Sequence, residues 1–201
     1  MKKGEKRKLE LLKIAYGMFI TKGYENTSVD GIIEEAGIAK GTFYYYFESK
    51  EQLLEDVIEM MLDEEIAKAE EVLSSDLPIP QRIVGIIASI RPGVGEKPIE
   101  DALHEDENAF MHNKVNKRIV ERLVPLLTRV AEEGISTGVF DCDNVPERVK
   151  VILILSNNLF NEPGYTPKDI EVFIDLIEKL LGAKKGTMDF VKALIDQPHL
   201  G

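Results

Sequence analysis

The chain has 201 residues, of which 44% are hydrophobic, enough for a real core in one large domain or two small ones. Its formal net charge of −11 argues against general affinity for nucleic acid, and its single cysteine excludes an internal disulfide framework. No apolar run approaches the roughly 20 residues needed to cross a bilayer, and the N-terminus lacks an apolar signal core, so we expect a cytoplasmic protein.

The charge is distributed unevenly along the chain. Residues 1–50 contain nine Lys and Arg against seven Asp and Glu, a net of +2, and the other 151 residues carry a net of −13. A weakly basic segment beside a strongly acidic one directs phosphate binding to the basic segment and repels a polyanion elsewhere. A contact with nucleic acid is therefore to be sought in the first 50 residues.

Apolar residues at spacings of three and four predict four helices in the first part of the chain. They cover residues 5–22, 28–36 and 40–46, and a long segment that starts after Ser49 and runs to about residue 73. Thr27 and Asp30 have the spacing of the hydroxyl and the acid in a capping box, and Ser49 is the expected cap of the fourth helix.

The rest of the chain also has helical periodicity. Further predicted helices cover residues 80–91, 111–134, 145–161, 167–182 and 187–196. Pro125 lies inside one of them and is expected to kink it or to free a carbonyl. Residues 97–109 are acidic and have no clear pattern, and no strand alternation is convincing, so the predicted fold class is all-α.

Five consecutive aromatic residues, 43–47, occur in a chain that has only 14 aromatic residues. In a helix, Phe43 and Phe47 share one face at i,i+4, while Tyr44 and Tyr45 point elsewhere. The two phenyl rings can then bury against neighbouring helices and leave tyrosine hydroxyls outward, which suits contact with nucleic acid. The alternative is that all five rings belong to an ordinary core.

The second and third predicted helices have the arrangement of a helix-turn-helix, in which the second helix enters the major groove of DNA. Gly37 permits the tight turn, and Ile38 supplies an apolar plug. Gly41 allows the backbone of the second helix to approach DNA closely, and Thr42 adds a hydrogen-bond donor beside the tyrosines.

Residues 11–54 resemble the DNA-binding domain of the TetR family of transcriptional regulators. The matching positions are Leu11, Leu12, Phe19, Gly23, Tyr24, Thr27, Ser28, Val29, Ile32, Ala36, Gly37, Lys40 to Phe47, Ser49, Lys50, Glu51 and Leu53. The resemblance implies a three-helix DNA-binding head at residues 1–48. It also implies an α-helical body for effector binding and dimerisation at residues 49–201, joined to the head by a long helix.

The resemblance also assigns roles in DNA binding. The residues expected at base edges or the groove wall are Lys40, Gly41, Tyr44 and Tyr45. The residues expected at phosphates, which position the protein without reading sequence, are Thr27, Thr42, Tyr46 and Lys50. The chain departs from the family at Ala39, where a capping serine is usual, and such a loss costs about 0.5–2 kcal/mol.

In this family the last two long helices pair with their copies as a four-helix dimer interface. The residues expected along that seam are Val151, Leu155, Leu159, Phe173, Leu176, Ile177 and Leu180. The alternative is that these side chains face only the core of their own protomer. A twofold dimer is also what a helix-turn-helix requires to read a palindrome.

The family body also encloses a small-molecule pocket, and a bound effector shifts the two heads away from the arrangement that fits DNA. The residues expected to line the pocket are Met61, Ile90, His104, Phe110, Met111 and Val115. The alternative for each is plain core. The effector itself is not identified by the sequence, and no cofactor is expected.

We expect no metal or catalytic site. His104 and His112 flank an acidic stretch but lack ligand spacing with each other. His104 could pair with Asp101 or Asn108 on a helix, but a solvated acidic face is the better interpretation. Cys142 lies between Asp141 and Asp143, which raise the pKa of a thiol and disfavour a redox role.

The sequence therefore predicts a DNA-binding transcriptional regulator and not an enzyme. The expected activity is that of a ligand-responsive repressor that binds palindromic operator DNA as a homodimer, without a membrane partner. The alternative is a small-molecule-binding helical protein, or an enzyme, that uses the C-terminal pocket while the head serves another partner.

Overall fold

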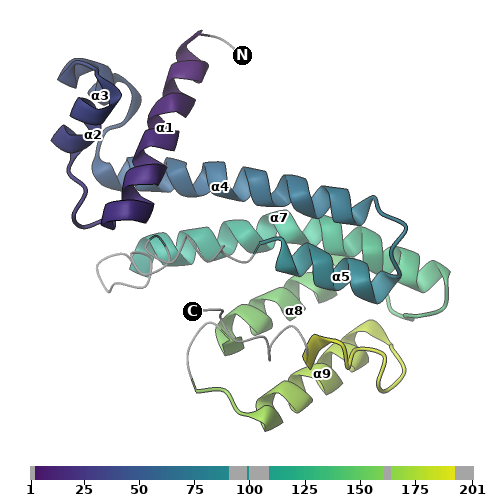
Figure 1. Ribbon diagram of the computed structural model, residues 1–201. Helices are drawn as coiled ribbons and strands as arrows, with labels where there is room; N and C mark the ends of the chain where they lie inside the picture. The colour runs from purple at the N-terminus through teal and green to yellow at the C-terminus, as the bar shows by residue number, and fades with distance from the viewer. Residues whose placement is uncertain (1–2, 91–98, 100–108, 161–163, 193–201) are drawn as a thin grey trace. The chain divides into compact units, whose positions relative to one another are not determined.

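The computed structural model describes residues 3–90, 99, 109–160 and 164–192 (Figure 1). Within these ranges the chain forms eight α-helices and no strand, which confirms the predicted all-α class. They are α1 (Lys3–Lys22), α2 (Val29–Ala36), α3 (Lys40–Tyr46), α4 (Lys50–Leu73), α5 (Ile79–Ala88), α7 (Ala109–Ser136), α8 (Val145–Phe160) and α9 (Pro167–Leu181). None of these described helices is long and apolar enough to span a membrane.

Most helix boundaries agree with the predicted ones to within two or three residues. The helix predicted at 187–196 is confirmed only in part, because residues 187–190 form turns, residues 191 and 192 are helical, and residues 193–196 lie outside the described ranges. Helix α7 continues through Pro125, so this proline does not end the helix. Because Pro125 has no backbone N–H, the Glu121 carbonyl four residues earlier lacks its usual helical donor.

The described helices belong to two compact units. The first contains α1, α2, α3, the part of α4 up to Glu64 and the part of α7 up to Val115. The second contains the remainder of α4 and α7 together with α5, α8 and α9. The functional division between residues 1–48 and 49–201 stays a prediction.

The first unit is organised around apolar side chains from each of its helices. Helix α1 packs against α2, and α2 packs against α3 (Figure 1). The fully buried side chains are Leu11, Ala15, Phe19, Ile32, Phe43, Leu53, Leu54 and Val57. Helix α3 has only seven residues and is too short to be stable by itself, so Phe43 within it and Phe47 directly after it hold it in this core.

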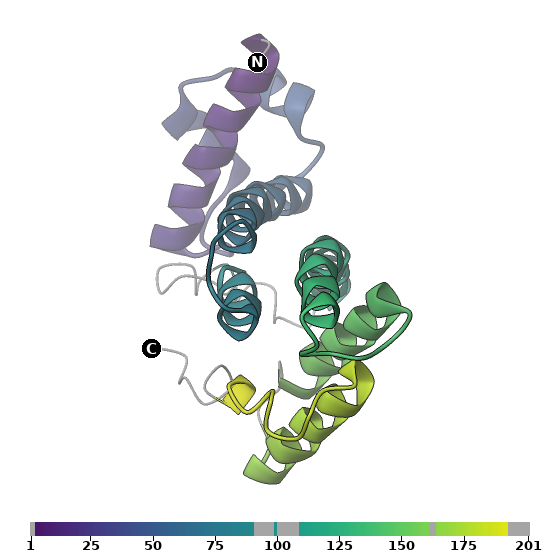
Figure 2. The ribbon, with the colours of Figure 1, turned by 90° about the vertical axis from the view of Figure 1, so that its right-hand side faces the viewer.

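In the second unit, α8 and α9 lie side by side (Figures 1 and 2). Helix α9 begins in a capping box, in which the Thr166 hydroxyl accepts from the backbone N–H of Asp169 and the Asp169 side chain accepts from that of Thr166. Near the start of α8, Arg148 donates hydrogen bonds of 2.7 Å to the Leu180 carbonyl and to the Asp143 side chain. This arginine therefore ties the first turn of α8 to the last turn of α9.

Helix α9 ends at Gly182, which has a φ of 62° in the left-handed region. The backbone N–H of Asp141 donates to the Leu181 carbonyl at 3.0 Å, so residue 141 lies against the end of the helix. A Cβ atom added to Gly182 would overlap the Asp141 carbonyl oxygen. Only glycine fits this position, both for its backbone conformation and for the space beside it.

We expect Gly182→Ala to lower the free energy of unfolding by on the order of 3 kcal/mol, because it combines a left-handed backbone with a backbone overlap. Urea denaturation would measure the loss. Gly138→Ala is the matched control, since Gly138 has a φ of 73° and no atom within 4 Å of an added Cβ. Its cost should be only about 1 kcal/mol. Equal losses for the two variants would show that the contact with Asp141 does not constrain the fold.

Candidate nucleic-acid interface

Helix α2 begins at a serine cap and ends at a left-handed glycine. The Ser28 hydroxyl accepts a hydrogen bond of 3.0 Å from the backbone N–H of Gly31. Gly37 ends the helix with a φ of 61°. The cap is thus Ser28, one residue later than the predicted Thr27, and position N3 holds a glycine instead of an acid. The turn glycine was predicted correctly.

Thr27 faces the interior of the first unit. Its side chain is 1% exposed, and its hydroxyl donates to the carbonyls of Gly23 at 2.8 Å and Met18 at 3.4 Å. These hydrogen bonds hold Thr27 against the end of α1 and the residue that follows it. A hydroxyl held in this way does not face a phosphate, and the role predicted for Thr27 is replaced by a structural one.

Helix α3 separates its aromatic side chains by role. Phe43 and Phe47 are 0% and 1% exposed, with ring centroids 5.5 Å apart. Tyr44 and Tyr45 are 49% and 80% exposed. Tyr46 is half-buried and lies edge-on to Tyr45, with ring centroids 4.9 Å apart. The predicted split is confirmed, and the alternative of five core rings is excluded.

The start of α3 presents exposed polar groups. Lys40 Nζ lies 3.3 Å from Asp30 Oδ1, and both side chains are exposed. An ion pair of this kind is worth less than about 1 kcal/mol, so the ammonium can exchange Asp30 for a phosphate. Gly41 is exposed, and no atom lies within 4 Å of an added Cβ, while Thr42 is half-buried.

The residue after the helix-turn-helix, Lys50, has a partner that the sequence did not reveal. Its Nζ lies 3.9 Å from the centroid of the Tyr24 ring, in a cation–π contact. The cap of α4 holds this region in place, because Ser49 Oγ accepts from the backbone N–H of Gln52 at 3.1 Å. A hydrogen bond from Ser49 also lowers the pKa of Glu51, so this carboxylate stays ionised in the first turn of α4.

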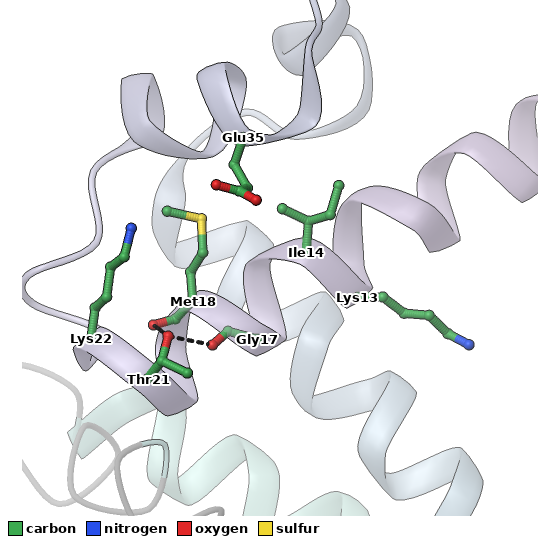
Figure 3. Close-up of a pocket in the computed structure, with 7 residues that line it drawn as sticks. All are labelled: Lys13, Ile14, Gly17, Met18, Thr21, Lys22 and Glu35. Carbon is green, nitrogen blue, oxygen red and sulfur yellow. Dashed lines mark hydrogen bonds between the residues drawn. The ribbon is translucent and has the colours of Figure 1, made fainter.

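A shallow groove of about 320 Å³ lies between α1 and α2. It is lined by Lys13, Ile14, Gly17, Met18, Thr21, Lys22 and Glu35 (Figure 3). Glu35 of α2 lies across the groove from Met18 of α1, and Lys13 points away from it (Figure 3). The opening arises partly because Gly17 has no side chain, as no atom lies within 4 Å of an added Cβ there.

The seven side chains predicted for a dimer seam differ in exposure. Val151, Leu155 and Leu176 are exposed, and Leu159 and Leu180 are half-buried. Phe173 and Ile177 are buried within their own protomer, where Phe173 meets Phe160 edge-on at 5.1 Å. Sequence reasoning missed two exposed apolar residues, Ile154 and Val172, although their helical spacing from Val151 and Leu176 was visible.

The residues predicted to line an effector pocket are only partly described. Met61 is half-buried and Val115 is buried in the first unit, and Ile90 is buried in the second. His104 lies outside the described residues, and Phe110 and Met111 belong to α7 with side chains that are not described. The pocket therefore stays a prediction.

The pKa of the Cys142 thiol is raised, as the sequence indicated, but the main cause is burial and not the neighbouring acids. Burial raises the pKa of the Cys142 thiol, and Asp143 and Asp141 raise it further, while Arg148 opposes them. The thiolate is therefore disfavoured at neutral pH, which is the opposite of what a reactive cysteine requires.

Comparison with known proteins extends the resemblance beyond the head. Residues 11–57 match the family model of bacterial regulatory proteins, tetR family. The HTH-type transcriptional regulator YfiR of Bacillus subtilis is 37% identical to this chain over 68% of the chain and 69% of its own length. The HTH-type transcriptional repressor KstR2 of Rhodococcus jostii is 27% identical over the same shares of each.

Solved structures share the fold. The structure of RolR without ligand covers 94% of this chain and 97% of its own, with a TM-score of 0.63 and 20% identity. The structure of a transcriptional regulator from Cytophaga hutchinsonii covers 87% of this chain and 95% of its own, with a TM-score of 0.57 and 20% identity. At these identities the likeness concerns the arrangement of helices alone.

Helix α3 lacks a side-chain cap, because its N-cap residue is Ala39. We expect Ala39→Ser to stabilise the protein by about 0.5–2 kcal/mol, since the extended backbone there allows a hydroxyl to accept from an unpaired helical N–H. Thermal unfolding and amide hydrogen exchange over residues 40–46 would measure the gain. Ala39→Val, which adds bulk without an acceptor, should bring no such gain. Equal behaviour of the two variants would contradict the capping argument.

Proposed function

The chain belongs to the TetR family of bacterial regulatory proteins and is a DNA-binding transcriptional regulator, and we propose that it is a ligand-responsive repressor acting as a dimer. The observation that carries the proposal is the orientation of α3, in which buried Phe43 and Phe47 leave Tyr44 and Tyr45 exposed. We also propose that it acts in the cytoplasm, together with its DNA target. Repression is proposed because relatives such as KstR2 of Rhodococcus jostii are repressors by name.

In the proposed complex, α3 enters the major groove. Lys40, Gly41, Tyr44 and Tyr45 meet base edges or the groove wall. Thr42, Tyr46 and Lys50 contact phosphates, with the Tyr24 ring directing the Lys50 side chain. Thr27 acts indirectly, by fixing the end of α1 against the start of α2.

The proposed dimer face lies on α8 and α9. Its apolar side chains are Val151, Ile154, Leu155, Val172 and Leu176, all of them exposed in the protomer. Leu159 and Leu180 are half-buried beside them, whereas Phe173 and Ile177 support the face from beneath. Exposed apolar residues on two neighbouring helices are suited to a four-helix contact with a second copy.

The effector site is proposed from the sequence alone, and its candidate residues are Met61, Ile90, His104, Phe110, Met111 and Val115. Met61 is half-buried and Val115 is buried within the first unit, as an apolar lining would require, and Ile90 is buried within the second. A bound effector would favour the arrangement of the two heads that does not fit adjacent major grooves, and so release the DNA. No catalytic role is proposed for the chain.

Replacing Tyr44 and Lys40 together by alanine should lower operator affinity at least about tenfold, since each contact in the groove is worth about 1–3 kcal/mol. Fluorescence anisotropy with duplex DNA from upstream of the protein's own coding region would measure it at fixed salt.

Lys117→Ala is the control for the loss of positive charge, because Lys117 is an exposed lysine of α7. It should bind as the unmodified protein does, and sedimentation should show an intact dimer for both variants. Normal binding by the double variant would place the DNA contact elsewhere.

Val172→Asp should weaken the dimer at least about tenfold, because a charge buried in an apolar interface is costly to desolvate. Val172 is 67% exposed in the protomer, so the substitution should leave the helical content unchanged. Sedimentation velocity over a concentration series would measure the dimer. Glu171→Ala, at the exposed neighbouring position, is the control. A dimer unaffected by Val172→Asp would exclude this face.

A further inference from the structure

We propose that Lys8 and Lys114 are positioning residues for α3, which they hold through two adjacent carboxylates of α4, Asp56 and Glu55. The proposal rests on the proposed function, because α3 is the helix assigned to DNA. It adds a set of residues that do not touch DNA but determine how firmly the DNA-contacting helix is held. All of them belong to the first compact unit.

The link on the α1 side passes through Lys8. Its Nζ lies 2.7 Å from Asp56 Oδ2 and 5.5 Å from the centroid of the Phe47 ring. The contact is a close charge pair and not an aligned hydrogen bond, because Asp56 Oδ2 has no hydrogen-bond partner among the described residues. Phe47 in turn packs on Phe43. Lys8 therefore contacts Phe47, one of the two rings that orient α3.

The link on the α7 side passes through Lys114. Its Nζ lies 2.5 Å from Glu55 Oε1. The Glu55 side chain is 24% exposed and that of Asp56 is 23% exposed, so solvent screens both pairs less than it screens an open surface pair. Successive residues point about 100° apart around a helix, and α4 thereby offers one carboxylate to α1 and the other to α7.

Together these contacts form a continuous chain from α7 through α4 and α1 to the rings beneath α3. Helix α7 extends from this contact to Ser136, well beyond the first unit. A change at the start of α7 can therefore alter the support of α3 without any new contact to DNA. The Lys8 ammonium contacts Asp56 and the Phe47 ring. The Lys40 side chain is instead exposed, and its ammonium pairs with the exposed Asp30 in a surface ion pair.

Charge exchange at the α7 pair tests the proposal. Lys114→Glu and Glu55→Lys should each lower operator affinity about fivefold or more, and the combined exchange should restore it to within about twofold, because contacting residues couple by about 0.5–3 kcal/mol. The slope of log affinity against log salt should stay unchanged, since a lost phosphate contact would reduce it by about 0.9. Lys117→Glu is the matched control on the same helix, where the pair with Glu121 is exposed and 3.9 Å long.

Amide hydrogen exchange in the DNA-free protein gives an independent readout. Lys114→Glu should raise exchange over residues 40–46, the combined exchange should reverse it, and Lys8→Met should raise it as well. Unchanged exchange in α3, or no restoration by the combined variant, would overturn the positioning role. A protein that shows this exchange pattern but no salt-sensitive binding to duplex DNA would overturn the proposed function alone.

Discussion

Burial of Phe43 and Phe47 is the constraint on which the DNA-contacting surface depends. A helix of seven residues forms too few hydrogen bonds to be stable alone. Helix α3 is therefore stable only because these two rings pack into the core of the first unit. Rings at i and i+4 also fix the rotation of the helix about its own axis. Once that rotation is fixed, the exposure of Tyr44 and Tyr45 follows from helical geometry.

The helices and the aromatic split could be predicted because both arise from local spacing. Residues 40–46 were predicted with the bounds that α3 has, since Gly37 and the i,i+4 phenylalanines mark the turn and the inner face. The cap of α2 was misplaced by one residue, because Thr27 and Ser28 both carry a hydroxyl. Only the burial of Thr27 shows which hydroxyl turns toward α1.

Contacts between distant segments could not be predicted from spacing. Lys114 and Glu55 are 59 residues apart, and each resembles many other lysines and glutamates of this charged chain. The same holds for α8 and α9, which carry apolar residues on more than one side. Periodicity identifies Phe173 and Leu176 as equally apolar, and only the packing of Phe160 against Phe173 shows which of them faces inward.

The approach of Asp141 to the end of α9 has a consequence for comparing this protein with others. Distant relatives are difficult to align by sequence in the body, because one apolar helical stripe fits another in several registers. Position 182 tolerates no side chain, because of its left-handed backbone and the neighbouring Asp141 carbonyl. A glycine at the corresponding place gives a fixed point from which the register of α8 and α9 can be set in distant sequences.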